Sequence, residues 1–219
     1  MIAIVIFWLS LALAVYVYAG YPLLLAVLRR VAKRPVAKQP IEPTVSLLVA
    51  AYNEADVIEA KIRNALALDY PAARLEIAIA CDGPNDGTTV IAQRVAKEIG
   101  QGRVRVFAYP VNRGKLHALN DTIPQLTGEI VAFSDASSML APDSMRTLVA
   151  NFADARVGAA SGVYRVLRGE EAALGKQEDF YWKYETYLKL AEADVGSILG
   201  CHGSLYAIRR ALYPFPKPG

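Results

Sequence analysis

The chain has 219 residues, a formal net charge of +3 and a hydrophobic fraction of 54%. That length fits one domain of moderate size plus an anchor, and the hydrophobic fraction is high for a purely soluble protein. The remainder of the chain is slightly acidic once one basic stretch is set aside, which excludes a general nucleic-acid-binding protein with a basic patch on its domain. The residues of that stretch are Arg29, Arg30, Lys33, Arg34 and Lys38.

The first predicted element is a transmembrane helix over residues 1–28. No charged residue occurs from Ile2 to Leu28. At about 1.5 Å per residue this stretch makes a helix of roughly 40 Å, longer than the ~30 Å hydrocarbon core of a bilayer. A cleaved signal peptide is the alternative, but it has a basic start and a shorter apolar core. Pro22 is expected to kink or end the helix near one face of the membrane.

Residues 29–43 are predicted to form a basic linker, in which three prolines oppose regular structure. Positive charge after the helix places the C-terminal side in the cytosol, so the expected location is the inner (cytoplasmic) membrane. The basic residues are expected to contact anionic headgroups of the lipid bilayer. In a cytosolic domain, Cys81 and Cys201 are expected to be free thiols.

From residue 44 to 219 apolar strands alternate with amphipathic helices. Continuous hydrophobic strands separated by helices predict an α/β domain, with a mainly parallel sheet covered by helices on both faces. The expected strands are 45–51, 75–81, 104–108, 130–133 and 158–166. The expected helices are 55–68, 88–99, 115–123 and 143–152, followed by one or two amphipathic helices within 170–193.

A polar cluster follows each of the first four predicted strands. In parallel sheets ligands bind beyond the carboxyl ends of the strands, so the clusters predict one site on one edge. Turn chemistry is the alternative explanation for each cluster taken alone. In Ser134–Ser138, however, carboxylate and hydroxyl oxygens at a strand end also suit a cation that binds a diphosphate. The four clusters are 52–54, 82–87, 112–115 and 134–138.

Five motifs in order resemble those of the family 2 glycosyltransferases, which have the Rossmann-like GT-A fold. The motifs are VSLLVAAYNEADVI, CDGPNDGT, NRGKLHALN, FSDASSMLAPDSM and GCHGSLYAIRR, and the resemblance covers Thr44 to Leu212. The membrane helix and the long aromatic segment are similar to those of bacterial synthases of cell-surface polysaccharides. The resemblance implies transfer of a hexose or N-acetylhexosamine from a UDP-sugar to a saccharide acceptor, with inversion at the anomeric carbon.

The resemblance also assigns donor-binding residues. Ala50, Tyr52 and Glu54 match the positions that hold the base and the ribose, and Asp82 matches the aspartate that accepts the uracil N3–H. Lys115, at a helix start after a glycine, matches a stretch near the diphosphate. The alternatives are that Asn53 and Glu54 only favour a helix N-terminus, that Asp82 only serves a turn, and that Lys115 is only a solvated charge.

Asp135 and Ser137 match the first and third positions of the family's DxD motif, so Asp135 belongs to the donor site and to the metal site. The implied cofactor is Mg²⁺ or Mn²⁺, which bind hard oxygen ligands and keep waters while they bridge phosphates. Ser137 departs from the motif, and its hydroxyl is a weaker ligand than a carboxylate. The segment containing Gly200, His202, Gly203 and Ser204 resembles the lining of the acceptor pocket.

The general base of the family, an aspartate in a TED-like motif, follows the GCHGSLYAIRR region. No residue here matches it, so the base is expected beyond Gly219 and the chain resembles a C-terminally shortened form with weak or absent catalysis on its own. The alternative is a non-catalytic nucleotide-binding or regulatory subunit, with a second membrane subunit that supplies the base. A nucleotidyltransferase is disfavoured, because AYNEAD after the first strand lacks a glycine-rich loop.

Overall fold

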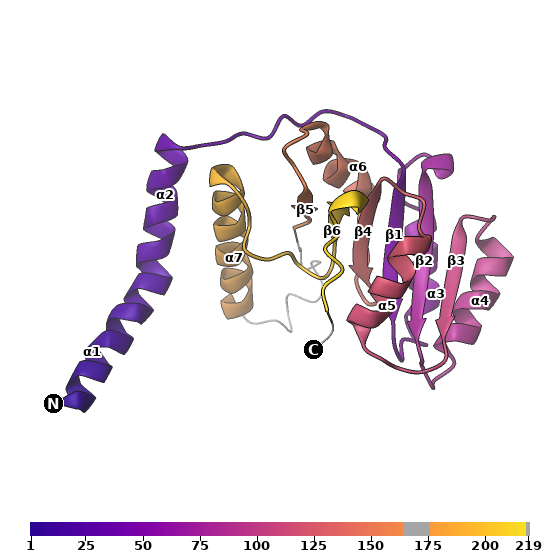
Figure 1. Ribbon diagram of the computed structural model, residues 1–219, viewed down its shortest axis with the longest axis horizontal. Coiled ribbons are helices and arrows are strands. Elements are labelled where there is room, and N and C mark those ends of the chain that lie inside the picture. Colours follow the sequence, from indigo (N-terminus) through magenta and orange to yellow (C-terminus); the bar gives the residue numbers. More distant parts are fainter. Residues whose placement is uncertain (164–175, 218–219) are drawn as a thin grey trace. The chain divides into compact units, whose positions relative to one another are not determined.

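The protein is described by a computed structural model that covers residues 1–163 and 176–217 (Figure 1). The chain divides into two compact units. The first unit comprises Met1–Val36 and Tyr164–Gly200, and the second comprises Ala37–Val163 and Cys201–Gly219. Residues 164–175, which include part of an expected strand and the start of an expected helix, lie outside the described residues.

The first unit begins with one long helix. It consists of α1 (Ile2–Val15), a π-helical turn (Tyr16–Gly20) and α2 (Tyr21–Val31). By length and composition it is the one helix among the described residues that is able to cross a membrane. The helix continues past Pro22. The wider π-helical turn at Tyr16–Gly20, just before Pro22, makes room for the proline ring. Pro22 has no N–H to donate to the backbone carbonyl of Tyr18, one turn earlier. The Tyr184 hydroxyl donates to that carbonyl instead, at 3.2 Å.

The other helix of the first unit is α7 (Lys176–Val195), which packs against α2. The Tyr21 hydroxyl donates to Oε1 of Glu192 at 2.7 Å, and Glu192 is only 9% exposed. The Asp194 carboxylate forms an ion pair with Arg29 at 2.6 Å, and the backbone carbonyl of Asp194 accepts the N–H of Arg34 at 2.7 Å. Carboxylates of α7 therefore bind the C-terminal half of the long N-terminal helix.

The second unit contains a six-stranded sheet with the order β3-β2-β1-β4-β6-β5. The first four strands are parallel, whereas β6 is antiparallel to both β4 and β5. The mainly parallel sheet predicted from the apolar runs is thus confirmed. The strands are β1 (Val45–Ala51), β2 (Leu75–Asp82), β3 (Val104–Tyr109), β4 (Ile130–Asp135), β5 (Ala159–Ser161) and β6 (Tyr206–Arg209).

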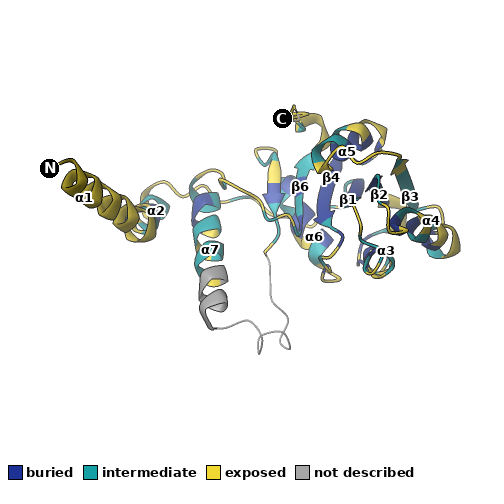
Figure 2. Cartoon of the chain, turned by 90° about the horizontal axis from the view of Figure 1, so that it is seen from below, coloured by how far each residue is buried: buried dark blue, intermediate teal, exposed yellow. Residues whose placement is uncertain are grey.

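Helices cover both faces of this sheet, because successive residues of a strand point to opposite faces. Leu47 and Val49 of β1 belong to the core shared with α3, α4 and α6, and Leu48 belongs to the core shared with α5. Figure 2 shows β1, β2 and β4 mostly in the colour of buried residues. The α-helices are α3 (Ile58–Leu66), α4 (Thr88–Ile99), α5 (Lys115–Thr122) and α6 (Ser144–Val149). Short 3₁₀ helices occupy Ala72–Arg74, Ile123–Gln125, Ala150–Ala153 and Arg210–Leu212.

The strand expected over 158–166 already ends at Ser161, as β5, and α3 begins at Ile58 and not at residue 55. The loop before it uses its backbone donors elsewhere. The N–H of Glu54 donates to Oγ1 of Thr88 at 2.9 Å, and the N–H of Ala55 donates to Oδ2 of Asp86 at 3.0 Å. These bonds hold the loop after β1 against the loop after β2.

Candidate functional site

The predicted site lies where the strand order reverses. The chain goes from β1 outward to β2 and β3, and then returns to place β4 on the other side of β1 (Figure 1). Ligands of open α/β sheets bind outside the carboxyl ends of the strands at such a point. Ala50 pairs in register with Asp135, so the ends of β1 and β4 lie side by side there. Two of the predicted donor-binding residues therefore meet at the reversal point.

Asp135 ends β4 and is surrounded by two other predicted site residues. Its Oδ1 accepts a hydrogen bond from Nζ of Lys115 at 2.6 Å. A Cβ atom added to Gly203 would lie only 2.8 Å from its Oδ2, so glycine leaves room beside the carboxylate. The Asp135 side chain keeps 39% of its surface exposed. The structure thus brings together Asp135, Lys115 and Gly203, with a carboxylate that solvent or a ligand reaches.

The acceptor segment joins the same place through its backbone. The Ser204 carbonyl accepts the hydroxyl of Ser134 at 2.6 Å, and the backbone N–H of His202 donates to Oγ of Ser161 at 3.3 Å. His202, Gly203 and Ser204 are therefore next to the end of β4. Gly200 belongs to the first unit, so the arrangement at β4 includes three of the four predicted acceptor residues.

The loop after β1 presents Tyr52 and Glu54. Tyr52 is 49% exposed, which leaves its ring available for stacking, and Glu54 is half-buried. Asn53 does not cap α3, contrary to the alternative interpretation of this residue, because the helix is preceded by Val57. It has a φ of 54°, and its side-chain oxygen accepts the backbone N–H of Asn85 at 3.0 Å, in the loop after β2.

Asp82 is almost fully buried, with 3% of its surface exposed, which is deeper than contact with a base alone requires. Its Oδ1 accepts the N–H of Arg113 at 3.1 Å, and its Oδ2 accepts the N–H of Gly114 at 2.8 Å. The carboxylate therefore fixes the loop that leads into Lys115. A carboxylate has about four acceptor positions, so these two bonds leave capacity for about two more donors.

Lys61 is not among the residues predicted for the site; it is a fully buried lysine on α3, with 0% exposure. Its Nζ donates to Oγ of Ser134 at 2.7 Å and to the carbonyl of Ser138. Burial lowers the pKa of the Lys61 ammonium to about 8, and the negative charge of Asp135 opposes that shift. A signal was available, since Lys61 follows Ile58 by three positions and precedes Ala65 by four, on the apolar face of the helix.

The protein ligands available to a cation are few. Ser137 is exposed, next to the Asp135 carboxylate in the chain. Within residues 1–163 and 176–217, no group of three or more His, Cys, Asp or Glu side chains gathers to hold a metal ion. One carboxylate and one hydroxyl do not complete the coordination shell of Mg²⁺ or Mn²⁺. They suit such an ion only if it keeps several waters and also binds phosphate oxygens.

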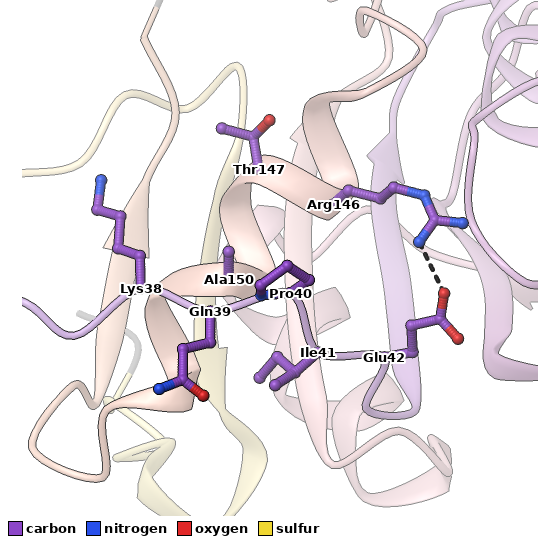
Figure 3. Close-up of a pocket in the computed structure, with 8 residues that line it drawn as sticks. All are labelled: Lys38, Gln39, Pro40, Ile41, Glu42, Arg146, Thr147 and Ala150. Atoms are coloured by element: carbon purple, nitrogen blue, oxygen red, sulfur yellow. Dashed lines mark hydrogen bonds and ion pairs between the residues drawn. The ribbon is translucent and has the colours of Figure 1, made fainter.

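A separate pocket of about 670 Å³ lies between the end of the linker and α6 (Figure 3). Lys38 to Glu42 form one side, and Arg146, Thr147 and Ala150 form the other. Arg146 forms an ion pair with Glu42 at 2.7 Å, drawn as a dashed line in Figure 3. No predicted site residue lines this pocket. The second half of the linker is therefore packed on the domain.

Comparisons with known proteins identify the family. The model of the glycosyl transferase family 2 matches residues 46–214. A β-monoglucosyldiacylglycerol synthase of Trichormus variabilis is 31% identical over 168 residues, which are 77% of this chain and 36% of that protein. A poly-β-1,6-N-acetyl-D-glucosamine synthase of Staphylococcus aureus is 34% identical over 134 residues, 60% of this chain and 31% of that protein. The chain thus spans about a third of the length of these relatives.

A solved structure covers more of the chain. The mannosyltransferase PcManGT of Pyrobaculum calidifontis, in complex with GDP-Man and Mn²⁺, is 33% identical with a TM-score of 0.76. The match covers 93% of this chain and 56% of that chain. Together with the sheet order and the grouping of the motif residues at the end of β4, these matches show that the chain belongs to glycosyl transferase family 2.

Proposed function

We propose that this chain forms the donor site of a glycosyltransferase that takes a hexose or N-acetylhexosamine from a UDP-sugar and passes it, with inversion, to a saccharide acceptor. The observation that carries the proposal is the grouping of Lys115, Asp135 and Gly203 at the reversal point of the sheet. The ammonium of Lys115, and a divalent cation held by the exposed Asp135 carboxylate, would suit a diphosphate. A nucleoside diphosphate is the leaving group of such a transfer. The relatives named as glycolipid and polysaccharide synthases support this class of reaction.

The divalent cation is proposed to bind at Asp135 and Ser137. The space that Gly203 leaves beside Oδ2 of Asp135 supports this placement, since any larger residue would place a carbon atom there. When bound, Mg²⁺ or Mn²⁺ supplies positive charge that stabilises the departing UDP. Lys115 now pairs with Asp135. Its ammonium would be released to the diphosphate when a cation takes the carboxylate.

Base selectivity tests the proposed donor. Asp82 accepts an N–H, and uracil carries a proton at N3 whereas cytosine does not. In calorimetric titrations with Mn²⁺, we expect UDP to bind at least about 10-fold more tightly than CDP. With CDP, the N3 lone pair of cytosine would face the Asp82 carboxylate, and a hydrogen bond to a charged group, which contributes about 1.5–3 kcal/mol, would be lost. Equal affinities for UDP and CDP would contradict the role of Asp82.

GDP belongs in the same series of titrations, since guanine N1–H also suits a carboxylate and the mannosyltransferase relative was solved in complex with GDP-Man. GDP binding tighter than UDP would retain the diphosphate site and Asp82 as acceptor, but overturn the choice of a uridine donor.

The long N-terminal helix is proposed to anchor this site to the inner membrane, with the hydrocarbon span ending near Gly20. Residues 2–20 form a helix of roughly 28 Å at about 1.5 Å per residue, close to the ~30 Å hydrocarbon core. Beyond Gly20, α2 binds the Glu192 and Asp194 carboxylates of α7. Charged groups of this kind are costly in hydrocarbon, so α2 and α7 are proposed to lie at the level of the lipid headgroups.

Two matched substitutions test where the span ends. Leu11 and Leu24 have similar exposure, 42% and 44%. Leu11→Arg places a charge in the proposed hydrocarbon span, which costs about 2.5–3.5 kcal/mol near the centre of a helix. We expect it to reduce the fraction of protein that sediments with membranes after alkaline extraction, whereas Leu24→Arg leaves that fraction unchanged. Equal losses in both variants would contradict a span that ends near Gly20.

A further inference from the structure

Lys61 places a positive charge inside the second unit, directly behind the loop that carries Asp135. The side chain is fully buried on the α3 face that also buries Ile58, Ile62 and Ala65. A buried ammonium is costly unless acceptors replace its water. An apolar residue of similar length would fill the same space at lower cost. The acceptors that Lys61 uses therefore indicate what the charge is there to hold.

Both acceptors belong to one short loop. Nζ of Lys61 donates to Oγ of Ser134 at 2.7 Å and to the carbonyl of Ser138. These two residues are the first and last of the stretch 134–138, and the predicted cation ligands Asp135 and Ser137 lie between them. One ammonium thus ties the two ends of the loop together from behind, while the ligands face outward.

The same ammonium sets the direction of a hydrogen bond to the acceptor segment. An ammonium has donors only, so Oγ of Ser134 accepts from Lys61 and keeps its own proton to donate. That proton goes to the carbonyl of Ser204 at 2.6 Å. Ser204 follows Gly203, which lies beside Oδ2 of Asp135. A continuous chain of contacts therefore joins α3, the end of β4 and the 203–204 segment.

We propose that Lys61 is a positioning residue for the divalent cation: by tying Ser134 to Ser138 it holds Asp135 and Ser137 in place and joins their loop to Gly203 and Ser204. This inference rests on the proposed cation site. With one carboxylate and one hydroxyl as protein ligands, the site depends strongly on their orientation. Residues that orient metal ligands typically contribute 10- to 100-fold in metal affinity, which sets the expected size of the effect at about that range.

The test measures the affinity for Mn²⁺ in the presence of saturating UDP, with the full chain in detergent and free Mn²⁺ followed by electron paramagnetic resonance. Lys61→Met keeps the length and apolar packing of the side chain and removes the ammonium. We expect Mn²⁺ to bind about 10- to 100-fold more weakly. UDP affinity without metal is expected to stay within about two-fold, a separation that general loss of structure would not produce.

Arg63→Met is the matched control. Arg63 lies on the same helix, is exposed and forms an ion pair with Glu59 at 2.7 Å, so the substitution also removes one cation from α3. We expect its Mn²⁺ affinity to equal that of the unaltered protein. A loss as large as that of Lys61→Met would overturn the inference, because it would assign the effect to net charge or to helix stability.

Ser134→Ala decides the matter if Lys61→Met fails to fold. It removes a hydroxyl from β4 and breaks the link from Lys61 to Ser204, and we expect a loss of Mn²⁺ affinity in the same direction. If the unaltered chain binds Mn²⁺ with UDP and both variants bind it equally well, Lys61 has no positioning role and the proposed function stands. If the unaltered, folded chain shows no Mn²⁺ binding with UDP, the proposed cation site itself is wrong.

Discussion

Asp135→Ala is expected to weaken Mn²⁺-dependent UDP binding by at least about 100-fold, the upper end of what the loss of a supporting residue costs. Asp135 is the one carboxylate of the 134–138 loop, and its removal leaves the Ser137 hydroxyl as the remaining predicted ligand there. The substitution also frees Lys115 from its ion pair. Calorimetric titration of UDP with Mn²⁺ measures the change.

Asp143→Ala provides the control for this prediction. Asp143 is exposed and precedes α6. Its replacement by alanine removes the same charge as Asp135→Ala, from the same stretch of chain. Its UDP affinity with Mn²⁺ is expected to match that of the unaltered protein. Retention of metal-dependent binding in Asp135→Ala would contradict the assignment of the cation to Asp135.

Gly83→Ala is expected to lower the stability of the protein by about 3 kcal/mol, through two additive costs. Gly83 has a φ of 59°, a left-handed conformation that costs a residue with a Cβ roughly 1–2 kcal/mol. The added Cβ would also lie 2.2 Å from the backbone N of Asn112, and such overpacking costs about 1–3 kcal/mol. For a chain of this size the melting temperature, followed by circular dichroism, should fall by about 6–12 °C.

Gly87→Ala separates the two costs. Gly87 also has a positive φ, 93°, but no atom lies within 4 Å of an added Cβ. Gly87→Ala should therefore cost only the backbone strain, without the overpacking. The melting temperature should fall by about 2–4 °C for each kcal/mol of that strain. Equal losses in Gly83→Ala and Gly87→Ala would show that the loop before Lys115 does not pack on Gly83 as described.

The sheet and the edge that carries the site were predictable from the sequence. Strands buried on both faces show as continuous apolar runs, and β1 to β4 begin at the residues where those runs begin. Because parallel strands connected by helices end at one edge, the polar residues after each run were expected to gather there. Ala50 opposite Asp135, and Lys115 in contact with Asp135, follow from that rule.

The contacts behind the site were not predictable in the same way. Lys61 is stable in its position only because it meets Ser134 and Ser138, which lie 73 and 77 residues further along the chain. Asp82 likewise binds backbone donors of a distant loop, at Arg113 and Gly114. A residue-by-residue pattern shows the polarity of such side chains but not their partners, since these depend on the register of the whole sheet.

The proposed donor site is tested most directly by a calorimetric titration of UDP into the detergent-solubilised chain, with and without Mn²⁺. We predict saturable binding with Mn²⁺ and binding at least about 10-fold weaker without it, because the proposed cation would join the diphosphate to Asp135. Absence of UDP binding under both conditions, in a protein shown to be folded, would contradict a donor site at the end of β4.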